Sequence, residues 1–172
     1  LPRLRKIPKK RIELSSDLSH EERGVAMARW LRREWNMGNS PVADPVELIE
    51  SLGYFIIGVD LGNTKLFAVT GKKRGNNIPG IVINTNRNIS VERQRYSVIH
   101  ELGHIVEHGE QFDAVPDSSG RGRNKDDRDR FADAFAGEFL VPGDELQRLY
   151  RQVYIKNFDN KVIYLKHHFK VS

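Results

Sequence analysis

The sequence predicts an α+β domain in which a small antiparallel sheet packs on a core of helices. Three strand-like runs, at residues 54–59, 65–70 and 78–84, are separated by turns rich in Gly and Asn. The connections between the runs are too short to hold crossover helices, which favours antiparallel pairing. Helical periodicity precedes these runs and returns from Ser90 towards the C-terminus.

Two helices are expected before the sheet, and both have clear start signals. Ser19 and Glu22 form a capping box ahead of apolar residues at helical spacing. Asp44 precedes Pro45, which suits an N-cap followed by a proline at the first helical position. Gly53 suits a left-handed exit from this second helix. We expect both helices to be scaffold.

The composition of the 172 residues excludes several classes of protein. Because it contains no cysteine, the chain has no disulfide framework, thiolate metal site or cysteine nucleophile. Its apolar runs fall short of the roughly 20 residues that span a bilayer, so no membrane partner is expected. Residues 1–12 are basic and lack the apolar block of a secretory signal, and a cytoplasmic location is expected.

The basic charge of the chain is concentrated at its N-terminus. The formal net charge is +5, and residues 1–12 contain six Lys or Arg and no acidic residue. The remainder has 22 basic and 23 acidic residues, a formal charge of −1. We expect residues 1–14 to be a basic tail or linker, which could contact phosphates or acidic partners or simply be solvated. The balanced remainder argues against direct nucleic-acid binding by this chain.

The most informative segment is His100-Glu101-Leu102-Gly103-His104, a His-Glu-x-x-His pattern. On a helix, residues i and i+4 share one face about 6 Å apart, so both imidazoles can bind one zinc ion. Glu101 is rotated away from that ion and can act as general base on a metal-bound water. The alternative is a chance pattern on a solvated helix. Against it, the opposite face is apolar, with Ile99 and Val106.

A catalytic zinc normally takes a third protein ligand, and two aspartates are candidates. Asp129 extends the buried stripe of a helix predicted within residues 126–142, so it should point at the neighbouring helix. Asp133 lies at the edge of that stripe and is a candidate hydrogen-bond partner for a ligand histidine. For both, the alternative is a carboxylate favoured by the helix dipole. Small residues at Gly103 and Ala132 suit a close approach of the two helices.

These segments together resemble a known family. Residues 94–104, 132–136 and 140–142 are similar to the motifs of the ImmA/IrrE family of zinc peptidase-like proteins, over about residues 19–150. The resemblance implies a zincin-like helical core carrying the His-Glu-x-x-His motif, with zinc as cofactor. It also implies a peptidase that cleaves a repressor-type transcription regulator in phage, mobile-element or stress responses. His100, His104 and Asp129 would be the ligands, although the family usually has glutamate at the position of Asp129.

The resemblance includes the strand Ile81-Val82-Ile83-Asn84, which we expect to be an edge that binds an extended substrate peptide. We expect a metallopeptidase-like domain at residues 15–150 and the start of a longer C-terminal helical segment at residues 151–172. Residues 109–124 predict a surface loop. The alternative function is a non-cleaving, metal-binding regulatory or sensor module partnered with a helix-turn-helix regulator.

Overall fold

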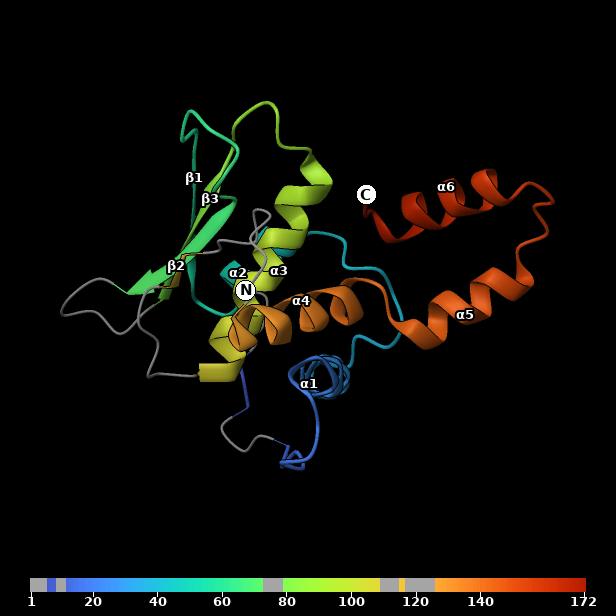
Figure 1. Cartoon of the computed structure of the whole chain (residues 1–172), viewed down its shortest axis with the longest axis horizontal. Helices are drawn as coiled ribbons and strands as arrows, with labels where there is room; N and C mark the ends of the chain where they lie inside the picture. Colours follow the sequence, from blue (N-terminus) through green and yellow to red (C-terminus); the bar gives the residue numbers. More distant parts are fainter. Residues whose placement is uncertain (1–5, 9–11, 73–78, 109–114, 117–125) are drawn as a thin grey trace.

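A computed structural model describes residues 6–8, 12–72, 79–108, 115–116 and 126–172 (Figure 1). The helices in these ranges are α1 (His20–Glu34), α2 (Pro45–Ser51), α3 (Val91–His108), α4 (Asp127–Leu140), α5 (Gly143–Gln152) and α6 (Phe158–Phe169). The strands are β1 (Phe55–Val59), β2 (Ala68–Lys72), β3 (Pro79–Asn84) and β4 (Val115–Pro116). Apart from β4, the loop predicted at residues 109–124 lies outside the described residues.

The four strands form one sheet in the order β1-β3-β2-β4. The α+β class is therefore confirmed, and both pairs that include β2 are antiparallel, as predicted. The β1–β3 pair differs, because it is parallel. The chain leaves β1, forms β2 on the far side, and then inserts β3 between the two. Strand β2 itself thus makes the crossover, so short connections are compatible with a mixed sheet.

The expected edge position of Ile81–Asn84 is wrong. These residues belong to β3, which is paired with β1 on one side and with β2 on the other, so its backbone cannot accept a further strand. Their side chains are structural as well. Ile81 and Ile83 are buried in the core. The amide of Asn84 donates hydrogen bonds to the carbonyls of Asn63 and Leu66 and so stabilises the turn before β2.

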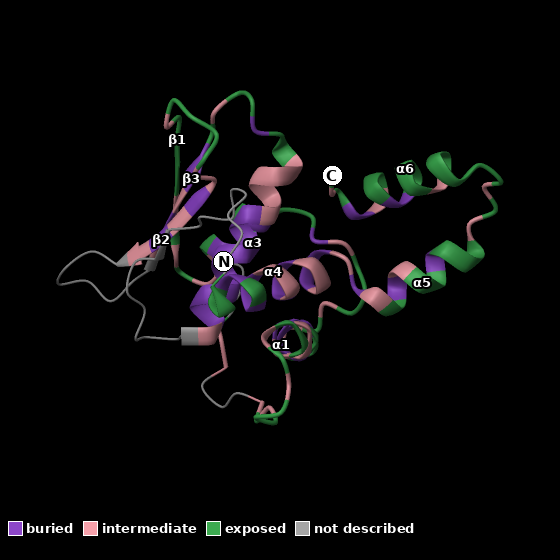
Figure 2. Cartoon of the chain, viewed as in Figure 1, coloured by how far each residue is buried: buried purple, intermediate pink, exposed green. Residues whose placement is uncertain are grey.

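Helix α3 lies at the centre of the core and packs against α4 on one side and against β2 and β3 on the other (Figure 2). Its buried apolar side chains are Val98, Ile99, Leu102, Ile105 and Val106. Helix α4 presents Phe131, Phe135 and Phe139 to this core as a row of stacked rings. Every residue between Val98 and Val106 is buried, so chemistry-bearing side chains there are held in a packed environment.

The start signals of α1 and α2 are confirmed. Ser19 and Glu22 form the reciprocal capping box. The carboxylate of Asp44 accepts hydrogen bonds from the first turn of α2. Gly53 has a φ of 84°, the left-handed conformation expected after that helix. These local devices fix where each helix begins and ends, and therefore which face it turns to the core.

The predicted N-terminal tail contacts the folded body in its described part. The side chains of Ile7, Ile12 and Leu14 pack on the main core. The indole of Trp35 donates a hydrogen bond to the carbonyl of Lys6 at 3.0 Å. At the other end of the chain, α5 and α6 pack on each other around a smaller apolar cluster. Across the described ranges, none of the helices is both long and apolar enough to cross a membrane.

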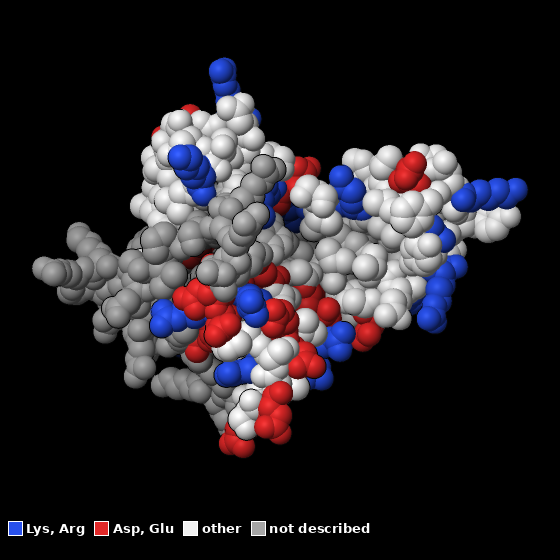
Figure 3. Space-filling view, viewed as in Figure 1, with Lys and Arg blue, Asp and Glu red and all other residues white. Residues whose placement is uncertain are grey.

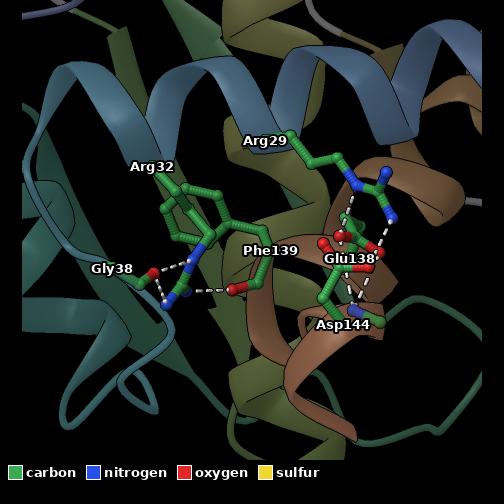
Figure 4. Close-up of polar contacts among 7 residues, drawn as sticks. Arg29, Arg32, Gly38, Glu138, Phe139 and Asp144 are labelled. Atoms are coloured by element: carbon green, nitrogen blue, oxygen red, sulfur yellow. Dashed lines mark hydrogen bonds and ion pairs between the residues drawn. The ribbon is translucent and has the colours of Figure 1, made fainter. Parts of the chain in front are cut away.

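Two arginines of α1 fix the position of α4 (Figure 4). Arg32 is buried and donates hydrogen bonds to the carbonyls of Phe139 at 2.6 Å and Gly38 at 2.8 Å. Arg29 donates to the carboxylate of Glu138 at 2.8 Å. The Phe139 carbonyl is at the C-terminal end of α4, where the helix dipole favours a cation. Hydrogen bonds from Arg32 thus connect the C-terminal end of α4 to α1 and to the loop that follows α1.

Candidate metal centre

The two histidines of the His-Glu-x-x-His pattern converge at the middle of α3. His100 and His104 are completely buried, and their Nε2 atoms lie 3.1 Å apart. Their spacing of four residues places both on one face of the helix. The apolar residues on the remaining faces pack into the core, so the helix cannot rotate to move these side chains into solvent.

Asp129 brings a carboxylate to the same point from α4. Its Oδ1 lies 4.0 Å from Nε2 of His100 and 3.7 Å from Nε2 of His104, and its side chain is only 8% exposed. One ligand atom from each residue lies within 4.8 Å of the others. A tetrahedral zinc with bonds of about 2.0–2.1 Å separates its ligand atoms by about 3.3 Å. The three residues therefore fit a single ion of this size after small side-chain adjustments.

The reach of the short aspartate depends on the close packing of α3 and α4. A Cβ added at Gly103 would lie 3.1 Å from Cα of Ala132, tighter than ordinary van der Waals contact. The small side chains at Gly103 and Ala132 therefore allow the close packing of α3 and α4 that was predicted from the sequence. With the helix axes this close, a side chain one methylene shorter than glutamate extends from α4 to the histidines of α3.

Asp133 lies on the other side of the His100 ring. Its Oδ1 is 2.9 Å from Nδ1 of His100. The hydroxyl of Tyr96 donates to the same oxygen, also at 2.9 Å. A proton on Nδ1 that is donated to Asp133 leaves the lone pair of Nε2 directed at His104 and Asp129. Asp133 thus makes the contact with His100 that was considered for it, and Tyr96, one turn before His100, is a further partner that the sequence analysis did not single out.

Glu101 stands beside the cluster. It is completely buried, and its Oε2 accepts a hydrogen bond from the hydroxyl of Thr70 on β2. Thr70 is also completely buried and was not recognised from the sequence. Nothing in the residues around Thr70 indicates this role, because the contact joins segments 31 residues apart through the packing of β2 on α3.

Acidic and basic side chains both lie around the centre. Exposed carboxylates gather around the N-terminal half of α4, where Asp126 and Asp127 lie at its start (Figure 3). On the last turn of α3, burial is the main cause that raises the pKa of Glu107, and the nearby Arg23 opposes that shift. Basic side chains, including Arg128 and Arg130, lie among these surface carboxylates, so the buried carboxylates of Glu101 and Asp129 are the groups that would attract a divalent ion.

A buried His-Glu-x-x-His helix, packed on a small sheet and faced by an acidic residue from the next helix, defines a protein of the metallopeptidase type. The family model Peptidase M78, described as the IrrE N-terminal-like domain, matches residues 52–172, more than two thirds of the chain. The chain belongs to this family. The matched range contains the whole sheet and helices α3 to α6. No curated protein matches the chain.

Proposed function

We propose that the chain is a zinc-dependent endopeptidase in which His100, His104 and Asp129 hold the ion and Glu101 is the general base. The observation that carries the proposal is the convergence of three buried ligand atoms, separated by 3.1–4.0 Å, from two helices. Two neutral imidazoles and one carboxylate are donors that zinc accepts readily, and three protein ligands leave a position open for chemistry. Membership of a peptidase family supports hydrolysis of a peptide bond.

When bound, zinc would supply Lewis-acid polarisation of the scissile carbonyl and of a water molecule. The protein supplies the proton transfers. Glu101 takes a proton from the attacking water while the oxygen of that water forms a bond to the carbonyl carbon. The same carboxyl group then gives that proton to the amide nitrogen as the C–N bond breaks. The products are a carboxyl terminus and an amine, and Glu101 returns to its carboxylate form.

Asp133 and Tyr96 act on the geometry of this site. Asp133 accepts a hydrogen bond from the Nδ1–H group of His100. This keeps the imidazole in the tautomer whose Nε2 lone pair can bind a metal. The Tyr96 hydroxyl holds Asp133 in turn. Because β3 is an interior strand, the substrate peptide would have to approach the site without pairing with Ile81–Asn84.

As substrate we propose a repressor-type transcription regulator, cleaved in a phage, mobile-element or stress response. This part of the proposal rests on the resemblance of the motifs at residues 94–104 and 132–142 to the ImmA/IrrE family. The lack of cysteine is compatible with a reducing, cytoplasmic setting, which we include in the proposal.

One observation favours the alternative of a non-cleaving sensor. His100, Glu101 and His104 are all completely buried, so a substrate peptide does not reach them in this conformation. In that case the ion would stabilise the fold that a helix-turn-helix regulator recognises, and Glu101 would have no part in hydrolysis.

Glu101→Gln separates the two functions. The amide cannot accept the proton of the water, so peptide hydrolysis should fall by about 10²–10⁴-fold while metal content and fold are kept. The assay uses a candidate repressor as substrate and follows the derepression response in cells. Loss of cleavage and response together supports the peptidase. If the response survives in Glu101→Gln but is lost in His104→Ala, the sensor replaces it.

A further inference from the structure

The hydroxyl group of Thr70 in the sheet is hydrogen-bonded to Glu101, the proposed general base. Thr70 lies in the middle of β2, and its hydroxyl donates to Oε2 of Glu101 on α3. Both residues are completely buried. Burying a hydroxyl or a carboxylate costs free energy unless it is hydrogen-bonded, and this contact satisfies a group on each partner.

The position of this donor is fixed by the sheet. In the register of the strands, Thr70 is paired with Ile81 of β3 and with Val115 of β4. A β-branched side chain has few χ1 rotamers, so a threonine in a paired strand presents its hydroxyl in a restricted direction. The donor therefore belongs to the rigid part of the molecule and not to a loop.

The carboxylate that it meets is intrinsically less restricted. Rotation about the last torsion of a glutamate is broad, because that bond joins an sp³ to an sp² carbon. A hydrogen bond from Thr70 to one oxygen fixes the plane of the Glu101 carboxylate and, with it, the direction of the other oxygen. The accepting atom of a general base must lie within about 2.6–3.2 Å of the heavy atom whose proton it removes, so this direction matters for proton transfer.

We propose that Thr70 is a positioning residue for Glu101, holding the carboxylate in the orientation needed for proton transfer during peptide hydrolysis. The inference rests on the proposed function. Two elements then determine the geometry of the reaction. Helix α3 supplies Glu101 and the proposed metal-binding histidines, and β2 supplies the hydroxyl that orients the Glu101 carboxylate. Packing alone does not require the hydroxyl, since valine has nearly the same shape.

Two substitutions at the same position separate the hydroxyl from the volume that it occupies. Thr70→Val keeps the shape and removes the donor, so kcat should fall by about 10–100-fold with KM changed by less than about twofold. Thr70→Ser keeps the donor and should restore kcat to within about fivefold of the parent. Zinc content should be the same in all three proteins, because Thr70 does not belong to the ligand cluster.

Crystal structures of the parent and both variants give a readout that does not depend on activity. The Glu101 carboxylate should keep its orientation in Thr70→Ser and rotate by more than about 30° in Thr70→Val. An unchanged orientation in Thr70→Val, an unchanged kcat, or a loss seen only in KM would each overturn the proposal. If Thr70→Val does not fold, Thr70→Ser compared with Thr70→Ala decides by the same criteria. A parent that binds zinc but cleaves no peptide refutes the proposed function, whereas the crystallographic comparison still tests the contact.

Discussion

Gly24 of α1 lies directly against the backbone of α4, and replacing it with alanine should separate the two helices. A Cβ added at Gly24 would lie 2.3 Å from the carbonyl oxygen of Phe131 and 3.0 Å from the amide nitrogen of Phe135. Carbon and oxygen atoms normally approach no closer than about 3.3 Å, so the first contact is too short by about 1 Å. Both neighbours are backbone atoms, which cannot turn aside. Relief requires movement of a whole helix.

The expected cost of Gly24→Ala follows from two opposing effects. Overpacking a well-packed interior costs about 1–3 kcal/mol, and an overlap with backbone belongs at the upper end. Alanine recovers up to about 1 kcal/mol through its higher helix propensity. The net loss should be about 2 kcal/mol in the free energy of unfolding. For a chain of this size that loss lowers Tm by about 4–8 °C.

Gly137→Ala is the matched control, because Gly137 also lies inside a helix, α4, but a Cβ there would meet nothing within 4 Å beyond the neighbouring backbone of that helix. The same substitution should therefore raise Tm by about 2–4 °C through helix propensity alone. Thermal unfolding followed by circular dichroism measures both variants. If Gly24→Ala were as stable as Gly137→Ala, the described contact between α1 and α4 would be refuted.

Two further stability predictions come from a buried and a half-buried ionisable side chain. Arg32→Lys should lower the free energy of unfolding by at least about 2 kcal/mol in chemical denaturation, because a lysine cannot replace a guanidinium that donates to several carbonyls. The control Arg33→Lys, at an exposed site, should change the free energy of unfolding little. Burial raises the pKa of Glu107 in the folded state, which costs stability above that pKa and nothing well below it. Glu107→Gln should thus raise Tm more at pH 8 than at pH 4, and an equal shift at both would contradict this.

The parts that could be predicted from the sequence are those encoded within a few neighbouring residues. Ser19 with Glu22, and Asp44 before Pro45, mark helix starts by local hydrogen bonds, and the structure has both. The face shared by His100 and His104 follows from the period of the helix.

Other features depend on contacts between distant segments and could not be read from local pattern. The insertion of β3 between β1 and β2 is decided by sheet assembly, so the interior position of Ile81–Asn84 was missed. Thr70 was missed for the same reason, since its partner is reached only after β2 packs on α3. The buried position of Asp129 could be predicted from the sequence, because the stripe of buried residues on its helix continues to Asp129.

The most direct test of the account is the metal content of this chain and of three variants, purified without chelator. The parent should contain close to one zinc per chain, and His104→Ala should contain almost none. Asp129→Ala should bind zinc at least about tenfold more weakly, with a smaller effect for Asp133→Ala, whose side chain orients His100. If His104→Ala bound zinc as well as the parent, the centre would be wrongly assigned. If Asp133→Ala proved the more damaging of the two aspartate variants, Asp133 and not Asp129 would be the third ligand.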